Sequence, residues 1–377
     1  MSTNYKKLGE IVELIDERNK SLESSEVLGI SIDKEFMPSV ANTIGTDLSN
    51  YKLLRMNTFA CNPMHVGRDE RLPVSLYKKD IPAIVSPAYF MFRVKDENKV
   101  LPDFLMLIFK RDDFDRNCWF RTDGSVRGGI TWNDICEIEL PVPDLKEQEK
   151  IINTYKAITK RIQLKQKINE NLEKTAECLF EKNVINNEQT EKGFFSQLIN
   201  LSIGGDWGKE FEEGNYKKKV TCIRGADIPD TRIGLTVNAP IRYILQKNYD
   251  NKSIQINDFV VEISGGSPTQ STGRITYISK ELRNHSLNDL ICSNFCRVLR
   301  LKDSSHQFFY QYWNYLYNKG VMFNYENSST GLKNFDLDTF INNEEIKIPS
   351  KETLDIIENC ISKLMTKIYY NGIEIEK

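Results

Sequence analysis

Glu139-Leu-Pro-Val-Pro-Asp-Leu-Lys-Glu-Gln-Glu-Lys-Ile-Ile152 is the stretch of sequence that decides the fold. Pro141 and Pro143 end a strand-like segment, because proline has no backbone N–H to donate to a sheet. After them, residues 146–182 contain no proline or glycine and are rich in Glu, Lys, Gln and Leu, which predicts one long helix. The stretch is therefore the junction between a globular domain and a helix of about 35 residues, ~50 Å long at 1.5 Å per residue.

The junction recurs farther along the chain as part of an internal duplication. Five pairs of segments match in order: 57–59 with 257–259 (offset 200), 86–94 with 293–301 (207), 123–127 with 330–333 (Gly331 − Gly124 = 207), 138–143 with 345–349 (206) and 151–152 with 356–357 (205). The offsets drift by only a few residues, and so long a period indicates two duplicated domains rather than a solenoid.

One face of the long helix carries an apolar heptad pattern. Its residues are Ile151, Tyr155, Ile158, Ile162, Leu172, Ala176 and Leu179, with Lys165 and Asn169 at two intervening core positions. The second repeat has a similar pattern at Leu354, Ile357, Ile361, Leu364 and Ile368. We expect the two helices to pair as an antiparallel coiled coil, with Asn169 fixing the register. Two helices packed on separate domains, and an exposed polar break at Asn169, remain the alternatives.

These patterns predict an α+β chain with two mixed domains in tandem, related by a pseudo-twofold internal repeat. The expected parts are a first domain over 1–145, a central spacer helix over 146–190, a second domain over 191–348 and a short C-terminal spacer helix over 349–377. Within the domains, 83–86 and 90–94 are expected as strands, and 101–109 and 307–318 as short helices.

Composition excludes several classes of protein. The 377 residues are 40% hydrophobic and 28% charged, values typical of globular proteins, and the net charge is −2. A nucleic-acid-binding surface must therefore be local. No apolar run approaches the ~20 residues of a membrane span, and the start lacks a signal-peptide core. Eight irregularly spaced cysteines indicate reduced thiols, so we expect a cytoplasmic protein.

Catalytic motifs are nearly missing from the sequence. It contains no phosphate-binding Gly-x-x-x-x-Gly-Lys-Ser/Thr loop and no Gly-x-Gly-x-x-Gly fingerprint. Asn62-Pro63-Met64-His65 lacks the second proline and the aromatic of an adenine methyltransferase motif. Asp230, Asp250 and Lys252 match a permissive Mg²⁺-nuclease pattern, which leaves a nuclease as an alternative. We therefore expect no catalytic residue.

We also expect no metal site. His285, Cys292, Cys296 and His306 have ligand chemistry. However, 290–301 is expected as one strand, on which residues four apart lie ~13 Å from each other, too far to share a metal. The two cysteines are therefore interpreted as buried structural residues.

Loops rich in hydrogen-bonding and basic side chains occur at matching places in the two repeats. Arginine and lysine read guanine, asparagine and glutamine read adenine, and Ser, Thr and backbone amides hold phosphates. The candidate DNA-binding residues are Arg68, Arg71 and Arg127 in the first domain and Thr269, Gln270, Arg274 and Lys333 in the second. Ordinary solvated turns are the alternative reading of each loop.

The sequence resembles the specificity subunit of bacterial type I restriction–modification systems over essentially its whole length. The resemblance rests on 28–33 (LGISID), 62–68 (NPMHVGR) and 84–89 (IVSPAY) in the first half, and on 205–208 (GDWG) and 222–228 (CIRGADI) in the second. The junction Glu139–Ile152 is the most specific of these segments.

The resemblance implies that two target-recognition domains each read a half-site of duplex DNA, while paired helices set the unread spacer. Recognition would be bipartite and asymmetric, and this chain would have no catalysis and no cofactor. The implied partners are DNA adenine methyltransferase subunits, which use S-adenosylmethionine, and restriction subunits that use ATP and Mg²⁺. A stand-alone DNA-binding or regulatory protein, and a helical scaffold, are the other readings.

The sequence departs from the family pattern in its second helical region, which is short. It begins near Lys351 and runs to Lys377. We therefore expect the distal part of the first helix, 170–182, to lack a partner within the chain. This leaves open how the methyltransferase docks and whether the chain dimerises.

Overall fold

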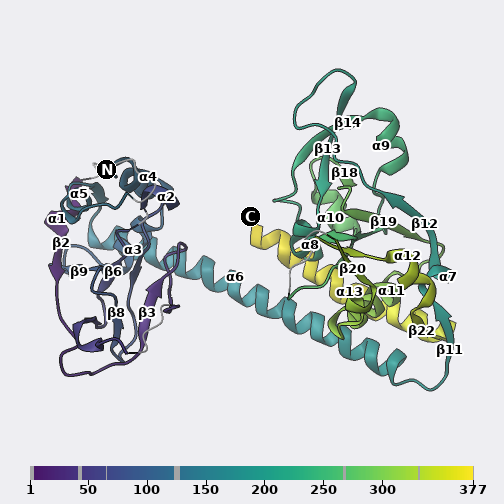
Figure 1. Cartoon of the computed structure of the whole chain (residues 1–377), viewed down its shortest axis with the longest axis horizontal. Helices are drawn as coiled ribbons and strands as arrows, with labels where there is room; N and C mark the ends of the chain where they lie inside the picture. The colour runs from purple at the N-terminus through teal and green to yellow at the C-terminus, as the bar shows by residue number, and fades with distance from the viewer. Residues whose placement is uncertain are drawn as a thin grey trace. The chain divides into compact units, whose positions relative to one another are not determined.

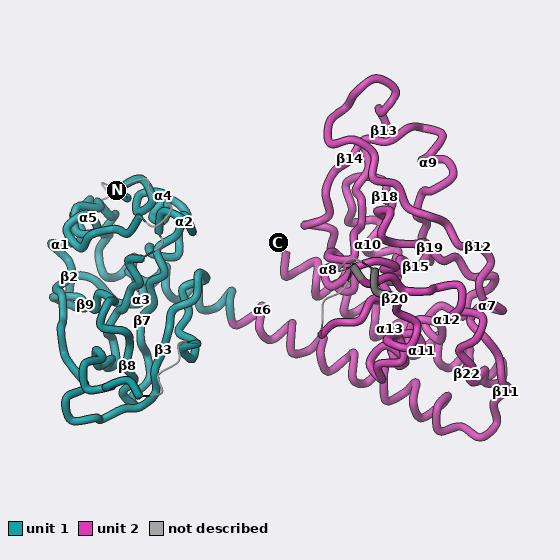
Figure 2. The backbone as a smooth tube through the Cα atoms, viewed as in Figure 1, with its two compact units in different colours: residues 1–159 teal, residues 160–377 magenta. Residues whose placement is uncertain are grey.

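The computed structural model describes residues 4–40, 45–64, 66–122, 128–265, 269–329 and 332–376. The chain divides into two compact units, 1–159 and 160–377, drawn in different colours in Figure 2. Helix α6 (Leu145–Phe180) begins in unit 1 and continues into unit 2. Among the helices within the described ranges, none is both long and apolar enough to cross a membrane.

Unit 1 is built around two four-stranded sheets, of which β2, β3, β6, β8 and β9 are labelled in Figure 1. Its strands are β1 (Asn4–Lys7), β2 (Val12–Ile15), β3 (Val27–Ile30), β4 (Phe36–Pro38), β5 (Lys52–Leu54), β6 (Phe59–Cys61), β7 (Val74–Leu76), β8 (Ala83–Val85), β9 (Phe90–Val94) and β10 (Glu139–Val142). Its short helices are α1 (Leu8–Ile11), α2 (Val66–Asp69), α3 (Pro102–Phe109), α4 (Asp112–Phe120) and α5 (Trp132–Cys136). The expected helix over 101–109 is thus α3, which begins at Pro102 because proline suits the first turn.

Unit 2 has the same kinds of elements and one additional sheet. Its strands are β11 (Thr190–Phe194), β12 (Ile199–Gly204), β13 (Tyr216–Ile223), β14 (Ile241–Leu245), β15 (Phe259–Glu262), β16 (Ser264–Gly265), β17 (Ile275–Tyr277), β18 (Asp289–Cys292), β19 (Cys296–Leu301), β20 (Glu326–Ser329), β21 (Leu332–Phe335) and β22 (Glu345–Pro349). Its helices are α7 (Phe195–Leu198), α8 (Ile228–Arg232), α9 (Gln246–Lys252), α10 (Lys280–His285), α11 (His306–Asn318), α12 (Leu337–Asn343) and α13 (Lys351–Glu376).

The two units share their sheet topology, as the duplication predicts. The order β2-β9-β6-β7 in unit 1 corresponds to β12-β19-β15-β17 in unit 2. A parallel pair, β3 with β8, corresponds to β13 with β18, and the antiparallel pair β1–β10 corresponds to β11–β22. Asn57 and Asn257 both have positive φ, 61° and 75°, two residues before the matched Phe59 and Phe259. Asparagine tolerates this left-handed conformation, so the same turn leads into β6 and β15.

Aromatic side chains form the centre of each core. In unit 1, Phe59 and Phe92 stack with ring centroids 5.0 Å apart, and Phe109 of α3 meets Phe59 edge-on at 5.5 Å. In unit 2, Phe259 lies 4.8 Å from Phe309 of α11. The matched phenylalanines of β6 and β15 thus anchor the helix that covers each sheet.

Helices α6 and α13 pair in opposite directions within unit 2. Lys165 Nζ lies 2.6 Å from a carboxylate oxygen of Glu374. Four residues further along α6, the buried Asn169 accepts a 2.8 Å hydrogen bond from the Nδ2 of Asn371 and donates to the carbonyl of Ile368. Residue numbers rise on one helix as they fall on the other, so the pairing is antiparallel. A buried asparagine pair of this kind disfavours other registers, because a shift would leave the amides unpaired.

The expectation that residues 170–182 lack a partner is wrong. Leu172, Ala176, Leu179 and Phe180 belong to the same apolar core as Ile357, Ile361, Leu364 and Ile368. The reason is the direction of pairing: in an antiparallel pair, the start of α13 lies against the end of α6. The exposed part of the stripe is instead the proximal one, where Ile151, Tyr155 and Ile158 are 38%, 43% and 57% exposed.

The segment expected as one strand over 290–301 is also different in the structure. It forms two strands, β18 and β19, which belong to different sheets. A turn at 293–295 separates them, and the Sγ of Cys292 lies 3.6 Å from the carbonyl oxygen of Cys296. The two cysteines are therefore close together, contrary to the ~13 Å separation on a continuous strand. Both are buried, as interpreted from the sequence.

A half-buried glutamate makes the stability of unit 2 depend on pH. Burial raises the pKa of Glu358 on α13 from 4.5 to about 7, while its carboxylate accepts a 2.9 Å hydrogen bond from the backbone N–H of Phe308. Between these two values the folded state binds more protons than the unfolded state, so the free energy of unfolding must fall as pH rises. We expect Glu358→Gln, which keeps the acceptor, to remove this loss in urea titrations at pH 5 and 7.5.

Glu352→Gln on the same helix is the matched control. The pKa of Glu352 is lowered, chiefly by a backbone hydrogen bond, so this side chain is ionised in both states across that range. An equal pH dependence in the wild type and in Glu358→Gln would contradict the assignment.

Candidate nucleic-acid interface

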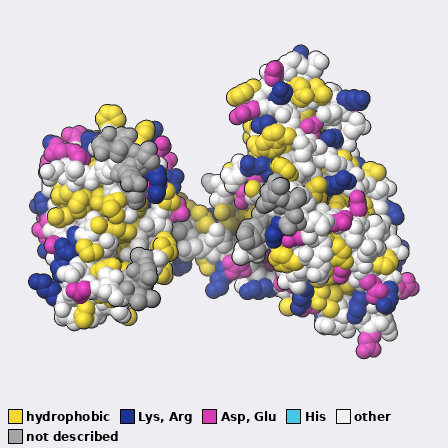
Figure 3. Space-filling view, viewed as in Figure 1, with side chains coloured by type: hydrophobic (Ala, Val, Ile, Leu, Met, Phe, Trp, Pro, Cys, Tyr) yellow, Lys and Arg dark blue, Asp and Glu magenta, His cyan; other side chains and the backbone are white. Residues whose placement is uncertain are grey.

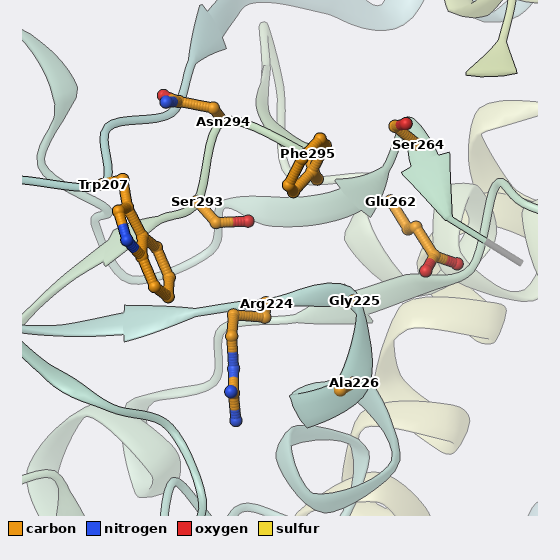
Figure 4. A pocket seen from close by; sticks show the side chains of 9 residues that line it. All are labelled: Trp207, Arg224, Gly225, Ala226, Glu262, Ser264, Ser293, Asn294 and Phe295. Carbon is orange, nitrogen blue, oxygen red and sulfur yellow. The ribbon is translucent and has the colours of Figure 1, made fainter. Parts of the chain in front are cut away.

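A hollow of about 400 Å³ opens on unit 2 between the loop after β12, the end of β13, the end of β15 and the turn between β18 and β19. We call it the β13–β15 hollow. Its lining residues, shown in Figure 4, are Trp207, Arg224, Gly225, Ala226, Glu262, Ser264, Ser293, Asn294 and Phe295. It combines aromatic faces, hydroxyls, an amide and charged groups in one place.

Two aromatic rings give the hollow an apolar, accessible part. Trp207 is 38% exposed and Phe295 is 57% exposed, and in Figure 4 their rings lie on either side of Ser293. The exposed amide of Asn294 stands beside them. Exposed aromatic faces stack on bases, and amides pair with the edge of adenine. The hollow can therefore hold a base or a planar group of similar size.

Trp207 is positioned by the neighbouring hairpin. The guanidinium of Arg242 on β14 lies 4.3 Å from the indole centroid, and its Nε donates a 3.0 Å hydrogen bond to the carbonyl of Trp207. The next residue, Gly208, has a φ of +61°, and a Cβ there would lie 2.3 Å from the carbonyl oxygen of Tyr243. Only glycine fits this close approach, so the Trp-Gly sequence fixes where the indole stands.

The two arginines near the hollow are held by acidic partners. Arg224 donates through Nε and NH2 to Asp227 at 2.9 and 2.8 Å, which raises the pKa of Arg224, and it also donates to the carbonyl of Asn238. In Figure 4 its guanidinium points away from the two aromatic rings. Arg224 therefore orders the loop around the hollow.

Arg274, directly before β17, forms a two-pronged ion pair with the buried Glu262 at the end of β15. Both hydrogen bonds are 2.8 Å, and the side chains are 18% and 4% exposed. Hydrogen bonding to Glu262 raises the pKa of Arg274. A Cβ at Gly225 would lie 2.2 Å from the Glu262 carboxylate, so the backbone also packs directly on the pair. The structure thus places Arg274 under the hollow, where it orients Glu262.

The other predicted residues of unit 2 lie beside this pair. Strand β16 pairs with β21, which brings Lys333 near the loop that carries Thr269 and Gln270. The Nζ of Lys333 lies 3.5 Å from the carbonyl oxygen of Gln270 and 3.1 Å from the carboxylate of Glu326. Thr269 and Gln270 are exposed, whereas the side chain of Lys333 is 21% exposed. The loop and the β20–β21 hairpin therefore form one surface.

In unit 1, two of the three predicted arginines are exposed and described. The guanidinium of Arg68 on α2 is 56% exposed and pairs with Asp69 at 2.6 Å, and Arg71 is 48% exposed and lies 3.8 Å from Asp33. Exposed pairs of this kind contribute little to stability and can be exchanged for phosphate contacts. Arg127 lies outside the described residues.

The alternative catalytic candidates make hydrogen bonds to other residues of unit 2. Asp230 accepts from Asn238, Asp250 accepts from Gln246, and Lys252 donates to the carbonyl of Gly205. Burial raises the pKa of the Cys222 and Cys296 thiols to about 12, which disfavours the reactive thiolate. Within the described ranges, no group of three or more His, Cys, Asp or Glu side chains could hold a metal ion.

Positive charge is dispersed over the visible surface. Figure 3 shows Lys and Arg interspersed with Asp and Glu on the visible face of both units, in agreement with the net charge of −2. On β13, Lys217 and Lys219 are exposed while Lys218 pairs with Asp289 at 2.7 Å. Any basic patch on this surface is therefore local, as the composition requires.

Sequence reasoning missed the aromatic and amide groups of the β13–β15 hollow. Trp207 stands in the 205–208 segment, which carries the family resemblance and no predicted site residue, and Asn294 and Phe295 lie within the segment expected as one strand. The glycine after Trp207 was the available signal, since a glycine next to an aromatic residue often marks a close backbone approach.

Comparisons with known proteins agree with this architecture. A family model described as "Type I restriction modification DNA specificity domain" matches residues 3–174 and 207–377. The structure of a type I restriction-modification system S subunit from M. genitalium has a TM-score of 0.57 and is 14% identical, covering 100% of this chain and 92% of that chain. At this identity the likeness shows the fold alone, and it confirms the tandem fold expected from the sequence.

A curated relative is similar over a shorter segment. The type I restriction enzyme HindI specificity subunit of Haemophilus influenzae is 30% identical over 105 residues, or 27% of this chain. The alignment spans 22% of the relative's length. Because the family model matches twice and covers most of both units, this chain belongs to the type I restriction modification DNA specificity domain family.

Proposed function

We propose that this chain is the DNA-reading subunit of a type I restriction–modification complex. Each unit reads one short half-site of duplex DNA, and α6 sets the length of the unread spacer between them. The observation that carries the proposal is the double match to the family model, at 3–174 and 207–377. Recognition is bipartite because there are two units, and asymmetric because their surface loops differ in sequence.

The chemistry of the exposed loops supports this reading. Arg68 and Arg71 in unit 1, and Gln270, Trp207 and Asn294 in unit 2, are exposed on their own unit. Guanidinium groups bind guanine or phosphate, amides bind adenine, and indoles stack on bases. Paired groups such as Arg274 and Lys333 hold the loops in place, so the exposed residues meet DNA without a large ordering cost.

The proposed complex supplies the chemistry that this chain does not. DNA adenine methyltransferase subunits with S-adenosylmethionine modify the site, and separate restriction subunits with ATP and Mg²⁺ cut unmodified DNA in the cytoplasm. With a net charge of −2, this chain has no strong overall attraction for DNA, so partner subunits share the phosphate contacts.

Substitutions in the two units are expected to affect different half-sites. Arg68→Ala should reduce discrimination at one half-site, and Gln270→Ala should do so at the other, each by about 1–3 kcal/mol, the worth of one bidentate base contact. The measurement is the binding of the assembled methyltransferase complex to duplexes that carry single base changes in either half-site.

Lys192→Ala is the control, because Lys192 is 80% exposed on the β11–β22 pair and its partner is Glu345. A single substitution that weakens both half-sites equally would contradict separate reading. Sequence-specific binding by the chain without any methyltransferase would instead favour a stand-alone regulator.

A further inference from the structure

Each unit exposes a phenylalanine in equivalent elements of the repeat. In unit 1, α4 begins three residues after the end of α3, and Phe120 at its last position is 84% exposed. In unit 2, the short 3₁₀ helix η4 (Val321–Tyr325) begins three residues after the end of α11, and its Phe323 is 46% exposed. Both elements precede the matched segments 123–127 and 330–333. The exposed ring is therefore a duplicated feature rather than an isolated exposed side chain.

In unit 1 the ring of Phe120 lies at the basic end of its helix. Arg121 follows it directly, and Arg116 is exposed on the same helix. The acidic residues of α4 all lie in its first turn, at the opposite end from Phe120. Helix α2, which carries the exposed Arg68, contacts α4, and both are labelled in Figure 1. Phe120 is therefore on the side of unit 1 that carries the candidate DNA contacts.

In unit 2 a basic side chain lies against the ring. The Nζ of Lys333 is 4.9 Å from the ring centroid of Phe323, and the same atom is 3.5 Å from the carbonyl oxygen of Gln270. Phe323 thus belongs to the surface formed by the loop with Gln270 and the β20–β21 hairpin. Lys333 matches Arg127 in the duplication. In both repeats a basic residue of the matched segment therefore follows the exposed ring.

Phe211 is an exposed phenylalanine in different surroundings. Its side chain is 75% exposed, and Glu210, Glu212 and Glu213 beside it are exposed as well. Three carboxylates repel the phosphates of DNA, whereas arginine and lysine attract them. The rings of Phe120 and Phe323 are therefore distinguished by their basic neighbours as well as by their exposure.

We infer that Phe120 and Phe323 each stack on a base in the half-site that their unit reads. Within a duplex the faces of the bases are covered by their neighbours, so a ring reaches one only where a base step is partly opened. Phenylalanine acts in this way as an apolar wedge in other DNA-binding proteins. The neighbouring arginines and lysine bind phosphates and offset the cost of opening the step. This inference rests on the proposed function and adds to it how each unit deforms its half-site.

The test is photochemical cross-linking in the assembled methyltransferase complex. The probe is a duplex that carries the gapped motif from the methylation map, with one pyrimidine at a time replaced by its 5-iodo derivative. Under ultraviolet light such a base cross-links to an aromatic side chain stacked on it, and mass spectrometry of the attached peptide identifies the residue. We expect Phe120 to be attached to one half-site and Phe323 to the other.

Substitutions connect each cross-link to affinity. Phe120→Ala should weaken binding of the motif at least about fivefold, the low end of what stacking on one base contributes. It should remove the cross-link in one half-site and leave the other, and Phe323→Ala should do the reverse. Phe120→Tyr keeps the ring and should lose less affinity than Phe120→Ala. Phe211→Ala is the matched control, with wild-type affinity and both cross-links. Circular dichroism checks that each variant folds.

The outcomes separate this inference from the proposed function. If the wild-type complex binds the motif specifically but neither Phe120 nor Phe323 is cross-linked, the inference is wrong and the proposed function stands. The same holds if Phe120→Ala and Phe323→Ala bind as tightly as the wild type. If the wild-type complex shows no preference for the motif, the proposed function is contradicted and the inference falls with it.

Discussion

Arg274→Ala is expected to lower the free energy of unfolding of unit 2 by about 3–5 kcal/mol, because it leaves the carboxylate of Glu262 buried without its counter-charge. Glu262 is 4% exposed, and both of its oxygens accept from Arg274 at 2.8 Å. The backbone of Gly225 packs against the same carboxylate, which lies in the wall of the β13–β15 hollow with little of its surface exposed. Urea unfolding followed by tryptophan fluorescence measures the loss.

The double variant Glu262→Gln with Arg274→Met separates charge from packing. Removing both charges should recover most of the stability, because the uncompensated buried charge causes most of the loss. We also expect Arg274→Ala to weaken recognition of the half-site read by unit 2 while the other half-site is unaffected. A stability within 0.5 kcal/mol of the wild type, the usual range for a surface substitution, would contradict the assigned burial.

Trp313→Ala is the second large expected effect, with a loss of about 3–5 kcal/mol in the free energy of unfolding. The side chain is 0% exposed, its Nε1 donates a 2.8 Å hydrogen bond to the carbonyl of Gly273, and its ring lies 4.9 Å from Phe340. Because Gly273 precedes Arg274, the indole also supports the loop beside the β13–β15 hollow. Trp313→Phe should lose less, since it keeps an aromatic ring in the core.

Trp119→Ala is the matched control in unit 1. Trp119 is 44% exposed, so its removal leaves no cavity and should change stability by less than about 0.5 kcal/mol. Thermal unfolding by calorimetry compares the two variants. If Trp313→Ala cost no more than Trp119→Ala, the core of unit 2 would be wrongly described.

The fold was predictable because its signals are local or repeated. Pro143 and the 146–182 run mark the start of the long helix, which the structure has as α6 (Leu145–Phe180). The duplication is informative because matched segments form equivalent elements in the two units, as β10 and β22 do. Strand β9 (Phe90–Val94) has the bounds expected from its apolar run, and β19 is its equivalent.

The errors came from features that only tertiary structure decides. The heptad patterns predict that α6 and α13 pair, but the direction of pairing decides which part of the α6 stripe is covered. The segment 290–301 has apolar residues on both sides of the Ser293–Phe295 turn, and apolar periodicity alone does not detect such a turn. Both cases needed knowledge of which strands and helices lie side by side.

The sequence predicts which loop of unit 2 lies at the candidate site, but it predicts only some of the residues that form the site. The loop around 264–274 does lie beside the β13–β15 hollow, yet the acid that pairs with Arg274 comes from Glu262, twelve residues earlier on the opposite strand. The loop itself contains no acidic residue, so its sequence gives no sign that Arg274 has an ion-pair partner. Trp207 and Asn294 come from two other loops, and no pattern within one segment joins them.

The most direct test of the central proposal is a map of N6-methyladenine across the source genome, with and without this gene. The account predicts a gapped motif of two unlike half-sites that disappears when the gene is deleted. Restoring the gene with Gln270→Ala should relax one half of that motif and leave the other half and the gap unchanged. An identical methylation map with and without the gene would contradict the proposal that this chain directs methylation.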